Sequence, residues 1–172
     1  MCLVASPADL EEARADLAEE TVVGLDTETR PAFKKGESHL PALVQAATGR
    51  AVWLFRLRRA ESFPVLAALL SSPRTVKAGV SLADDLRALK ALFPFEERNL
   101  LDLGHAARRA GFAQTGVRNL AGIVLGLRIP KGAKTTNWAA RELTPAQIAY
   151  AATDAWACRE LYLEFQRLGM LG

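Results

Sequence analysis

The amino-acid sequence predicts an α/β protein, in which helices pack on a mixed sheet. Two observations lead to this class. Three strand-like segments occur early in the chain, and helices and strands alternate after them. The chain has 172 residues, of which 50% are hydrophobic and 24% charged, as is typical of one globular domain with a sizeable core. We therefore expect residues 1–172 to form a single domain.

The first third of the chain predicts a helix and the three strands. Ser6-Pro7 starts the helix, because serine is favoured at the N-cap and proline in the first turn. A strand is expected at 21–28, and a polar loop follows it from Arg30 to His39. Ala42–Ala47 and Ala51–Leu57 are expected to pair as a hairpin.

Helices and strands alternate in the rest of the chain. The expected elements are a helix at Ser62–Leu70, a strand at Thr75–Val80, a helix at Leu82–Phe93, a strand at Asn99–Leu103, helices at 104–111 and Val117–Leu125, and a last helix from Thr144-Pro145 to Arg167. The irregular segments 30–41 and 128–140 are the longest, and long loops in compact domains are often functional.

The charge balance, the cysteines and the length of the apolar runs indicate which class of protein to expect. The 22 basic and 19 acidic residues give a net charge of +3, which suits a polyanionic substrate but is weak evidence alone. Cys2 and Cys158 lie far apart and lack ligand-type spacing, so a reduced, cytoplasmic protein is the default expectation. No apolar run reaches the ~20 residues that span a membrane, and no signal peptide is visible.

The most informative feature is a pair of carboxylates at the end of the first strand, Asp26 and Glu28. Side chains two residues apart in a strand point to the same face, which places their Cα atoms roughly 6.5–7 Å apart. Two such acids repel each other unless a cation or a shared proton neutralises them. The pair therefore indicates a site for a divalent metal ion.

Tyr150 and Asp154 form a second pair, one turn apart on the same face of the last helix. Alanines surround them, and an unpaired acid among apolar side chains would be costly to bury. Asp154 is therefore a further candidate ligand. A local ion pair between Asp154 and Arg159 is the structural alternative.

Asp84 and Asp85, at the start of a helix, need separate explanations. Ser81 is a plausible N-cap, which makes Asp84 a capping-box acid and leaves Asp85, about 100° further round the helix, as another candidate ligand. The alternative is that both acids simply favour the helix dipole. Asp102, at the end of the next strand, is expected to cap the helix that follows it.

Taken together, these residues resemble the DEDD superfamily of 3′–5′ exonucleases, in the branch of ribonuclease D and the Werner syndrome helicase exonuclease domain. The family motifs correspond to Asp26-Thr27-Glu28, to Asp85 after the strand Lys77-Ala-Gly-Val, and to Tyr150 with Asp154. Ala42-Leu-Val-Gln45 and Asn137-Trp138 are also similar to the family. The motifs occur in the family's order over nearly the whole chain.

The resemblance implies a ribonuclease H-like fold. It also implies the tyrosine branch of the superfamily (DEDDy), because a sister branch carries histidine at the position of Ala149. The sequence departs from ribonuclease D in ending at Gly172, without the C-terminal helical nucleic-acid-binding domain of that enzyme.

The resemblance further implies a two-metal mechanism. Four carboxylates without cysteine or histidine ligands suit two divalent cations, Mg²⁺ or Mn²⁺, which clamp the attacking and leaving oxygens from about 3.5–4 Å apart. Asp26 is expected to bridge both ions, Glu28 and Asp154 to complete the first, and Asp85 to hold the second through water. Tyr150 would orient the attacking water without ionising, and a 5′-mononucleotide would leave.

The expected partner is nucleic acid with a free 3′ end, single-stranded or 3′-recessed. The candidate contacts are Thr27, Thr29, Leu82, Lys131, Lys134 and Asn137 for the terminal nucleotide, Arg30, Lys34 and Lys35 for phosphates, and Trp53, Trp138 and Trp156 for base stacking. Solvated loop is the simpler alternative for Lys131 and Lys134, and core packing for Leu82 and the tryptophans.

Two other functions stay open on the sequence alone. Leu25-Asp-Thr-Glu-Thr29 superficially matches haloacid-dehalogenase-like phosphatases, although their second acid is aspartate and they would leave Tyr150 and Asp154 without a role. The other alternative is a nucleic-acid-binding module without catalysis, but the complete set of acids gives no indication of a decayed site.

Overall fold

The computed structural model describes residues 1–130, 132 and 136–171, and its centre is a six-stranded sheet in the order β1-β4-β3-β2-β5-β6. The strands are β1 (Cys2–Leu3), β2 (Val22–Thr29), β3 (Pro41–Ala47), β4 (Val52–Arg56), β5 (Val76–Gly79) and β6 (Leu100–Asp102). β3 is antiparallel to both β2 and β4, whereas β5 is parallel to β2 and β6, and β1 is parallel to β4. The predicted mixed sheet is confirmed.

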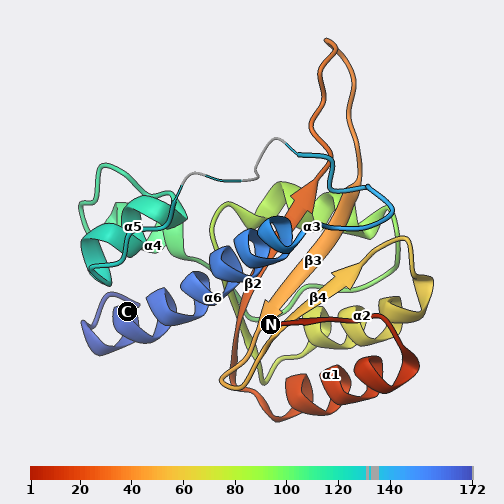
Figure 1. Cartoon of the computed structure of the whole chain (residues 1–172). Helices are drawn as coiled ribbons and strands as arrows, with labels where there is room; N and C mark the ends of the chain where they lie inside the picture. Colours follow the sequence, from red (N-terminus) through yellow and green to blue (C-terminus); the bar gives the residue numbers. More distant parts are fainter. Residues whose placement is uncertain (131, 133–135, 172) are drawn as a thin grey trace.

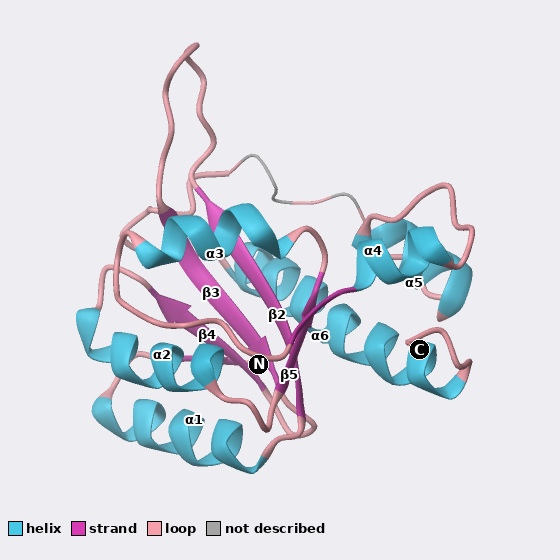
Figure 2. Cartoon of the chain, turned by 180° about the vertical axis from the view of Figure 1, so that it is seen from behind, coloured by secondary structure: helices cyan, strands magenta, loops and turns pink. Residues whose placement is uncertain are grey.

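Helices cover both faces of this sheet. They are α1 (Pro7–Glu19), the 3₁₀ turn η1 (Ala60–Ser62), α2 (Phe63–Ser71), α3 (Leu82–Lys90), α4 (Leu103–Arg109), α5 (Val117–Val124) and α6 (Pro145–Arg167). α6 crosses one face, and α1, α2 and α3 lie on the other, as the two opposite views show (Figures 1 and 2). α4 and α5 lie beside the C-terminal half of α6. None of the described helices combines the length and the apolar character needed to cross a membrane.

Three of the predicted helix starts are confirmed by cap hydrogen bonds. Ser6 caps α1 and Thr144 caps α6, each in a reciprocal capping box, and Asp102 caps α4 by accepting from the amide of His105. Ser81 does occupy the N-cap position of α3, but the predicted capping box is wrong. Its backbone is left-handed, with φ 59°, and its side chain makes no cap bond.

Alternation along β2 determines which helices its side chains face. Val23 and Leu25 belong to the core that β2 shares with α1, α2 and α3. Gly24, Asp26 and Glu28 therefore point to the opposite face, which α6 covers. The two predicted ligands of β2 thus lie under the helix that carries the third, Asp154.

Candidate active site

Three of the predicted ligands meet at the end of β2. Asp26, Glu28 and Asp154 each offer a carboxylate oxygen, and these oxygens lie within 4.8 Å of one another. Glu28 and Asp154 are only 8% exposed, so two of the three charges are largely withdrawn from water. The structural alternative for Asp154 is an ion pair with Arg159; the ion pairs of Arg159 described in the structure are with Glu20 and Glu160.

Small residues at the crossing of α6 and β2 make this meeting possible. A Cβ on Gly24 would lie 2.1 Å from the carbonyl oxygen of Ala155 and 2.6 Å from the amide nitrogen of Arg159, so only glycine fits. Ala151 and Ala155 are fully buried on α6. α6 can therefore approach β2 closely, which places Asp154 beside Asp26 and Glu28.

Tyr150 lies one turn before Asp154, and Arg118 of α5 holds its hydroxyl. Arg118 Nη2 donates to the Tyr150 hydroxyl at 2.6 Å, and its guanidinium carbon lies 5.2 Å from the ring centroid. Trp138 packs on the same ring at 6.0 Å, and a Cβ on Gly132 would lie 2.9 Å from it. The tyrosine is thus fixed from several sides.

The phenol of Tyr150 stays neutral at physiological pH. Burial raises its pKa to about 12, the negative charges of Asp154 and Glu28 add to the shift, and Arg118 opposes it. Because arginine has only donors, the hydroxyl oxygen accepts from Arg118 and its own proton remains for a carboxylate such as Asp154. The site therefore holds a hydrogen-bond donor, not a phenolate.

Asp85 is the predicted ligand that lies outside the group of three acids, as far as the described residues show. Its Oδ1 accepts a 2.7 Å hydrogen bond from the Thr27 hydroxyl, which points to the α3 side of β2. Burial raises the pKa of Asp85, and this hydrogen bond counteracts part of the rise. Asp84 is different: it is exposed and pairs with Arg87 at 2.8 Å.

An open cleft of about 330 Å³ gives access to the acids. Its lining consists of Asp26, Thr27, Glu28, Val80, Gly116, Val117, Arg118, Asn119, Tyr150 and Asp154. A second hollow of about 1010 Å³ shares Arg118 and Asn119 with it and continues along the segment from Gly126 to Pro130. The acid cluster is therefore open to a ligand larger than a metal ion.

Several predicted substrate contacts have other roles in the structure. Leu82 is 3% exposed and packs in the core, which agrees with the simpler alternative and not with a contact to the terminal nucleotide. Trp53 is buried with its indole NH on Asp16, and Trp138 is 1% exposed, so neither can stack on a base. Trp156 keeps 38% exposure.

The remaining candidates divide into three groups. Thr27 lines the cleft, although its hydroxyl is engaged with Asp85, and Thr29 pairs with Pro41 at the strand end. The side-chain oxygen of Asn137 accepts a hydrogen bond from the amide of Ala139. The predicted contact of Asn137 with the terminal nucleotide stays a prediction. Lys131 and Lys134 lie outside the described residues.

Sequence reasoning did not single out Arg118. It lies 32 residues from Tyr150 in a helix without a recognisable motif, so no local spacing connects the two. A lone arginine in an amphipathic helix is normally a solvated side chain, and only the tertiary structure brings it to the tyrosine.

The donor set fits divalent cations that prefer oxygen. Among the described residues, three carboxylates converge without a histidine or cysteine in the group, which suits Mg²⁺ or Mn²⁺ rather than zinc. Since oxygen ligands lie about 2.0–2.6 Å from such ions, oxygens within 4.8 Å of one another can share one. The cation would also remove the mutual repulsion of the acids.

Comparison with known proteins gives consistent results. A family profile described as 3′–5′ exonuclease matches residues 2–169. Ribonuclease D of Haemophilus influenzae is 33% identical over 147 residues, which cover 84% of this chain and 36% of that protein. The mouse bifunctional 3′–5′ exonuclease/ATP-dependent helicase WRN is 32% identical over 168 residues, which cover 94% of this chain and 12% of that protein.

The fold agrees with these matches. The crystal structure of Escherichia coli ribonuclease D, described as an exoribonuclease involved in structured RNA processing, superimposes with a TM-score of 0.81 at 22% identity. The match covers 99% of this chain and 46% of that one. The predicted ribonuclease H-like fold is thereby confirmed. The chain spans less than half the length of the ribonuclease D proteins that it resembles.

Proposed function

The chain belongs to the 3′–5′ exonuclease family, and on this premise we propose that it hydrolyses phosphodiester bonds from the 3′ end of DNA or RNA. The products are 5′-mononucleotides, and residues 1–172 act as one exonuclease domain. The observation that carries the proposal is the convergence of Asp26, Glu28 and Asp154 at an open cleft, with Tyr150 one turn away.

The three clustered acids are proposed to hold two divalent cations together with Asp85. When bound, Mg²⁺ or Mn²⁺ supplies an activated water and neutralises charge on the leaving oxygen. Asp85 has to turn from its hydrogen bond with Thr27, or act through a water molecule, because its oxygens lie apart from the other three acids.

Tyr150 is proposed to orient the attacking water. Its neutral hydroxyl offers a proton toward the acids, and Arg118 holds the oxygen in place, so the phenol needs no ionisation to act. Arg118 also brings a positive charge to a cleft whose other charged lining residues, Asp26, Glu28 and Asp154, are carboxylates. We assign it the role of a positioning residue that also attracts the phosphate of the terminal nucleotide.

The proposed substrate is nucleic acid with a free 3′ end, as the names of the ribonuclease D and WRN relatives suggest. Cytoplasmic location belongs to the same proposal and rests on the cysteine usage.

The test is a cleavage assay with end-labelled oligonucleotides of DNA and of RNA. Each is offered with a free and with a blocked 3′ end, in Mg²⁺, in Mn²⁺ and in chelator, with Asp26→Asn as the matched control. Ladders that start at the free 3′ end, need the metal and vanish in the control support the exonuclease.

Two other outcomes would contradict the proposal. Hydrolysis of a small phosphomonoester with intact oligonucleotides would favour the phosphatase, a class that gives Tyr150 and Asp154 no role. Binding of oligonucleotides without cleavage in either metal would favour the non-catalytic module.

A further inference from the structure

The hairpin between β2 and β3 leaves the sheet directly at the acid cluster. β2 ends at Thr29, one residue after Glu28, and β3 begins at Pro41. Both cartoon views show the chain from 30 to 40 projecting far beyond the sheet and its helices (Figures 1 and 2). Anything bound at the acids therefore has this hairpin beside it.

The tip of the hairpin is a turn that is held by hydrogen bonds. Gly36 adopts φ +85°, which favours glycine, and the amide of Glu37 donates to the carbonyl of Lys34 at 3.1 Å. One oxygen of Glu37 accepts the amides of Phe33 and Lys34 at 3.0 and 3.3 Å. The other lies 3.0 Å from the imidazole of His39.

The hairpin has a basic surface, because three cations stand against one carboxylate, Glu37. Arg30, Lys34 and Lys35 are all exposed, and Glu37 is held by the backbone amides of the turn. Exposed cations beside an acid-lined cleft suit a polyanion whose end enters the cleft while its backbone passes outside.

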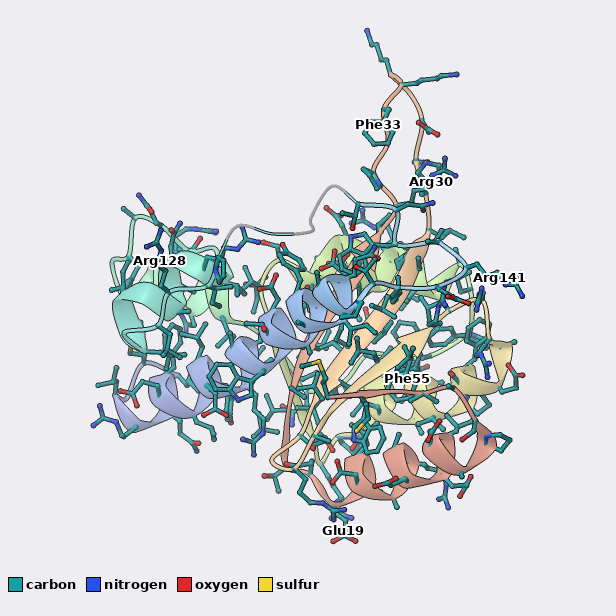
Figure 3. All side chains as sticks on the ribbon, in the orientation of Figure 1. Glu19, Arg30, Phe33, Phe55, Arg128 and Arg141 are labelled. Carbon is teal, nitrogen blue, oxygen red and sulfur yellow. The ribbon has the colours of Figure 1, made fainter. Side chains whose placement is uncertain are left out.

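Phe33 is the unexplained residue of this surface. Its side chain is 78% exposed, and Figure 3 shows it on the projecting hairpin above Arg30, away from the core. An aromatic ring in water next to two lysines has no packing role. Aromatic rings interleaved with cations are how proteins hold single-stranded nucleic acid, by stacking on bases and pairing with phosphates.

We propose that the hairpin Arg30–Leu40 grips the substrate strand upstream of its 3′ end, with Phe33 stacked on a base and Arg30, Lys34 and Lys35 on phosphates. The proposal rests on the proposed function. Phe33 is five residues beyond Glu28, up to roughly 16 Å along an extended chain. The contact is therefore placed upstream of the last two nucleotides of the strand, where a dinucleotide does not reach.

The experiment compares the wild type with Phe33→Ala, Phe33→Trp and the control Leu168→Ala, which removes another exposed apolar side chain (49%) just after α6. Binding of a single strand of about ten nucleotides is measured by fluorescence anisotropy in the Asp26→Asn background. Cleavage is measured in the active protein, with that strand and with a dinucleotide.

Phe33→Ala is expected to weaken binding of the longer strand about 5- to 100-fold. It should raise KM for that strand without lowering kcat, and leave dinucleotide cleavage unchanged. Phe33→Trp should restore binding, and Leu168→Ala should have no effect. Replacing Lys34 and Lys35 by glutamine should flatten the salt dependence of binding.

Equal binding by Phe33→Ala and wild type overturns the inference. If that variant instead lost a dimer in sedimentation, the hairpin would be a self-association surface, and the inference would again be wrong. Absence of cleavage by the wild type on both substrates would contradict the proposed function alone, because the binding comparison does not need turnover.

Discussion

At the scale of residues, the site is a concentration of negative charge that the fold holds together. Two like charges about 4 Å apart repel by roughly 4 kcal/mol at the effective dielectric of a protein surface. Asp26, Glu28 and Asp154 lie in that range, and two of them are almost buried. A bound cation turns this repulsion into attraction, so affinity for metal is the property that the arrangement favours.

Replacing each of the adjacent acids of α3 tests the assignment of the fourth ligand. Asp85→Asn should lower kcat at least about 100-fold, because Asp85 is the proposed ligand of the second cation. Asp84→Asn should be nearly neutral, because an exposed pair with Arg87 contributes little. Steady-state cleavage of an oligonucleotide decides, and the reverse order of the two effects would show the assignment to be wrong.

A double-mutant cycle tests whether Arg118 acts through Tyr150. Tyr150→Phe should lower kcat roughly 10- to 100-fold, because the water loses its orienting hydroxyl. Arg118→Met should lower kcat by less and raise KM as well, and its kcat effect should shrink in the Tyr150→Phe background. Additive effects on kcat would mean that Arg118 does not act through the tyrosine.

The sequence predicts the residues of the site where they are neighbours in the chain. Asp26 and Glu28 share a strand face, and Tyr150 and Asp154 share a helix face, so spacing alone relates each pair. The Arg118 contact is beyond such reasoning, because it joins residues 32 positions apart. The Thr27–Asp85 bond spans 58 positions, and spacing does not reveal it either.

At the scale of elements, the crossing of α6 over β2 positions the site. Gly24→Ala should destabilise the protein by about 2–3 kcal/mol, because its Cβ would lie 2.1 Å from a backbone oxygen of α6. The folded fraction should also lose cleavage activity, because Asp154 moves with the helix. Thermal melting and cleavage assays measure both effects.

Gly122→Ala in α5 is the matched control. A Cβ there meets nothing closer than 3.8 Å, and alanine favours a helix, so a gain of about 0.5–1 kcal/mol is expected. If Gly24→Ala were as stable and active as this control, close contact of α6 with β2 would not be what positions Asp154.

The order and type of the main elements followed from periodicity and capping signals, and the exceptions have physical causes. β1 is two residues long and forms by pairing with β4. A segment this short has no hydrophobic periodicity from which a strand could be predicted. The predicted capping box of α3 does not form, because the Ser81 amide donates to Asp102 Oδ2 at 3.0 Å rather than to Asp84, in a left-handed turn. That contact lies in the tertiary structure, outside any local pattern.

At the scale of the whole molecule, one buried charge tests how the sheet is stabilised. Lys77 of β5 is fully buried, its ammonium donates to the carbonyl of Ser72 at 2.7 Å, and burial lowers its pKa to about 8. Between pH 8 and 10.5 the unfolded chain holds this proton and the folded one does not. Stability therefore rises with pH across that window, and the cost of Lys77 is complete below it.

Lys77→Met should accordingly stabilise the protein at pH 7. The lowered pKa corresponds to on the order of 3 kcal/mol, offset by about 1 kcal/mol for the lost hydrogen bond. Urea unfolding from pH 7 to 10.5 should show a rise in the wild type that the variant lacks. Parallel curves for the two proteins would contradict this view of Lys77.

The proposed cleavage depends on metal binding by the clustered acids, and counting bound Mn²⁺ by electron paramagnetic resonance tests this dependence most directly. With a 5′-mononucleotide present, the wild type should bind two coupled ions per chain. Asp26→Asn should remain folded, lose the coupled pair and cleave roughly a thousandfold more slowly or worse. If Asp26→Asn bound Mn²⁺ and cleaved oligonucleotides as the wild type does, the three carboxylates would not be the metal site.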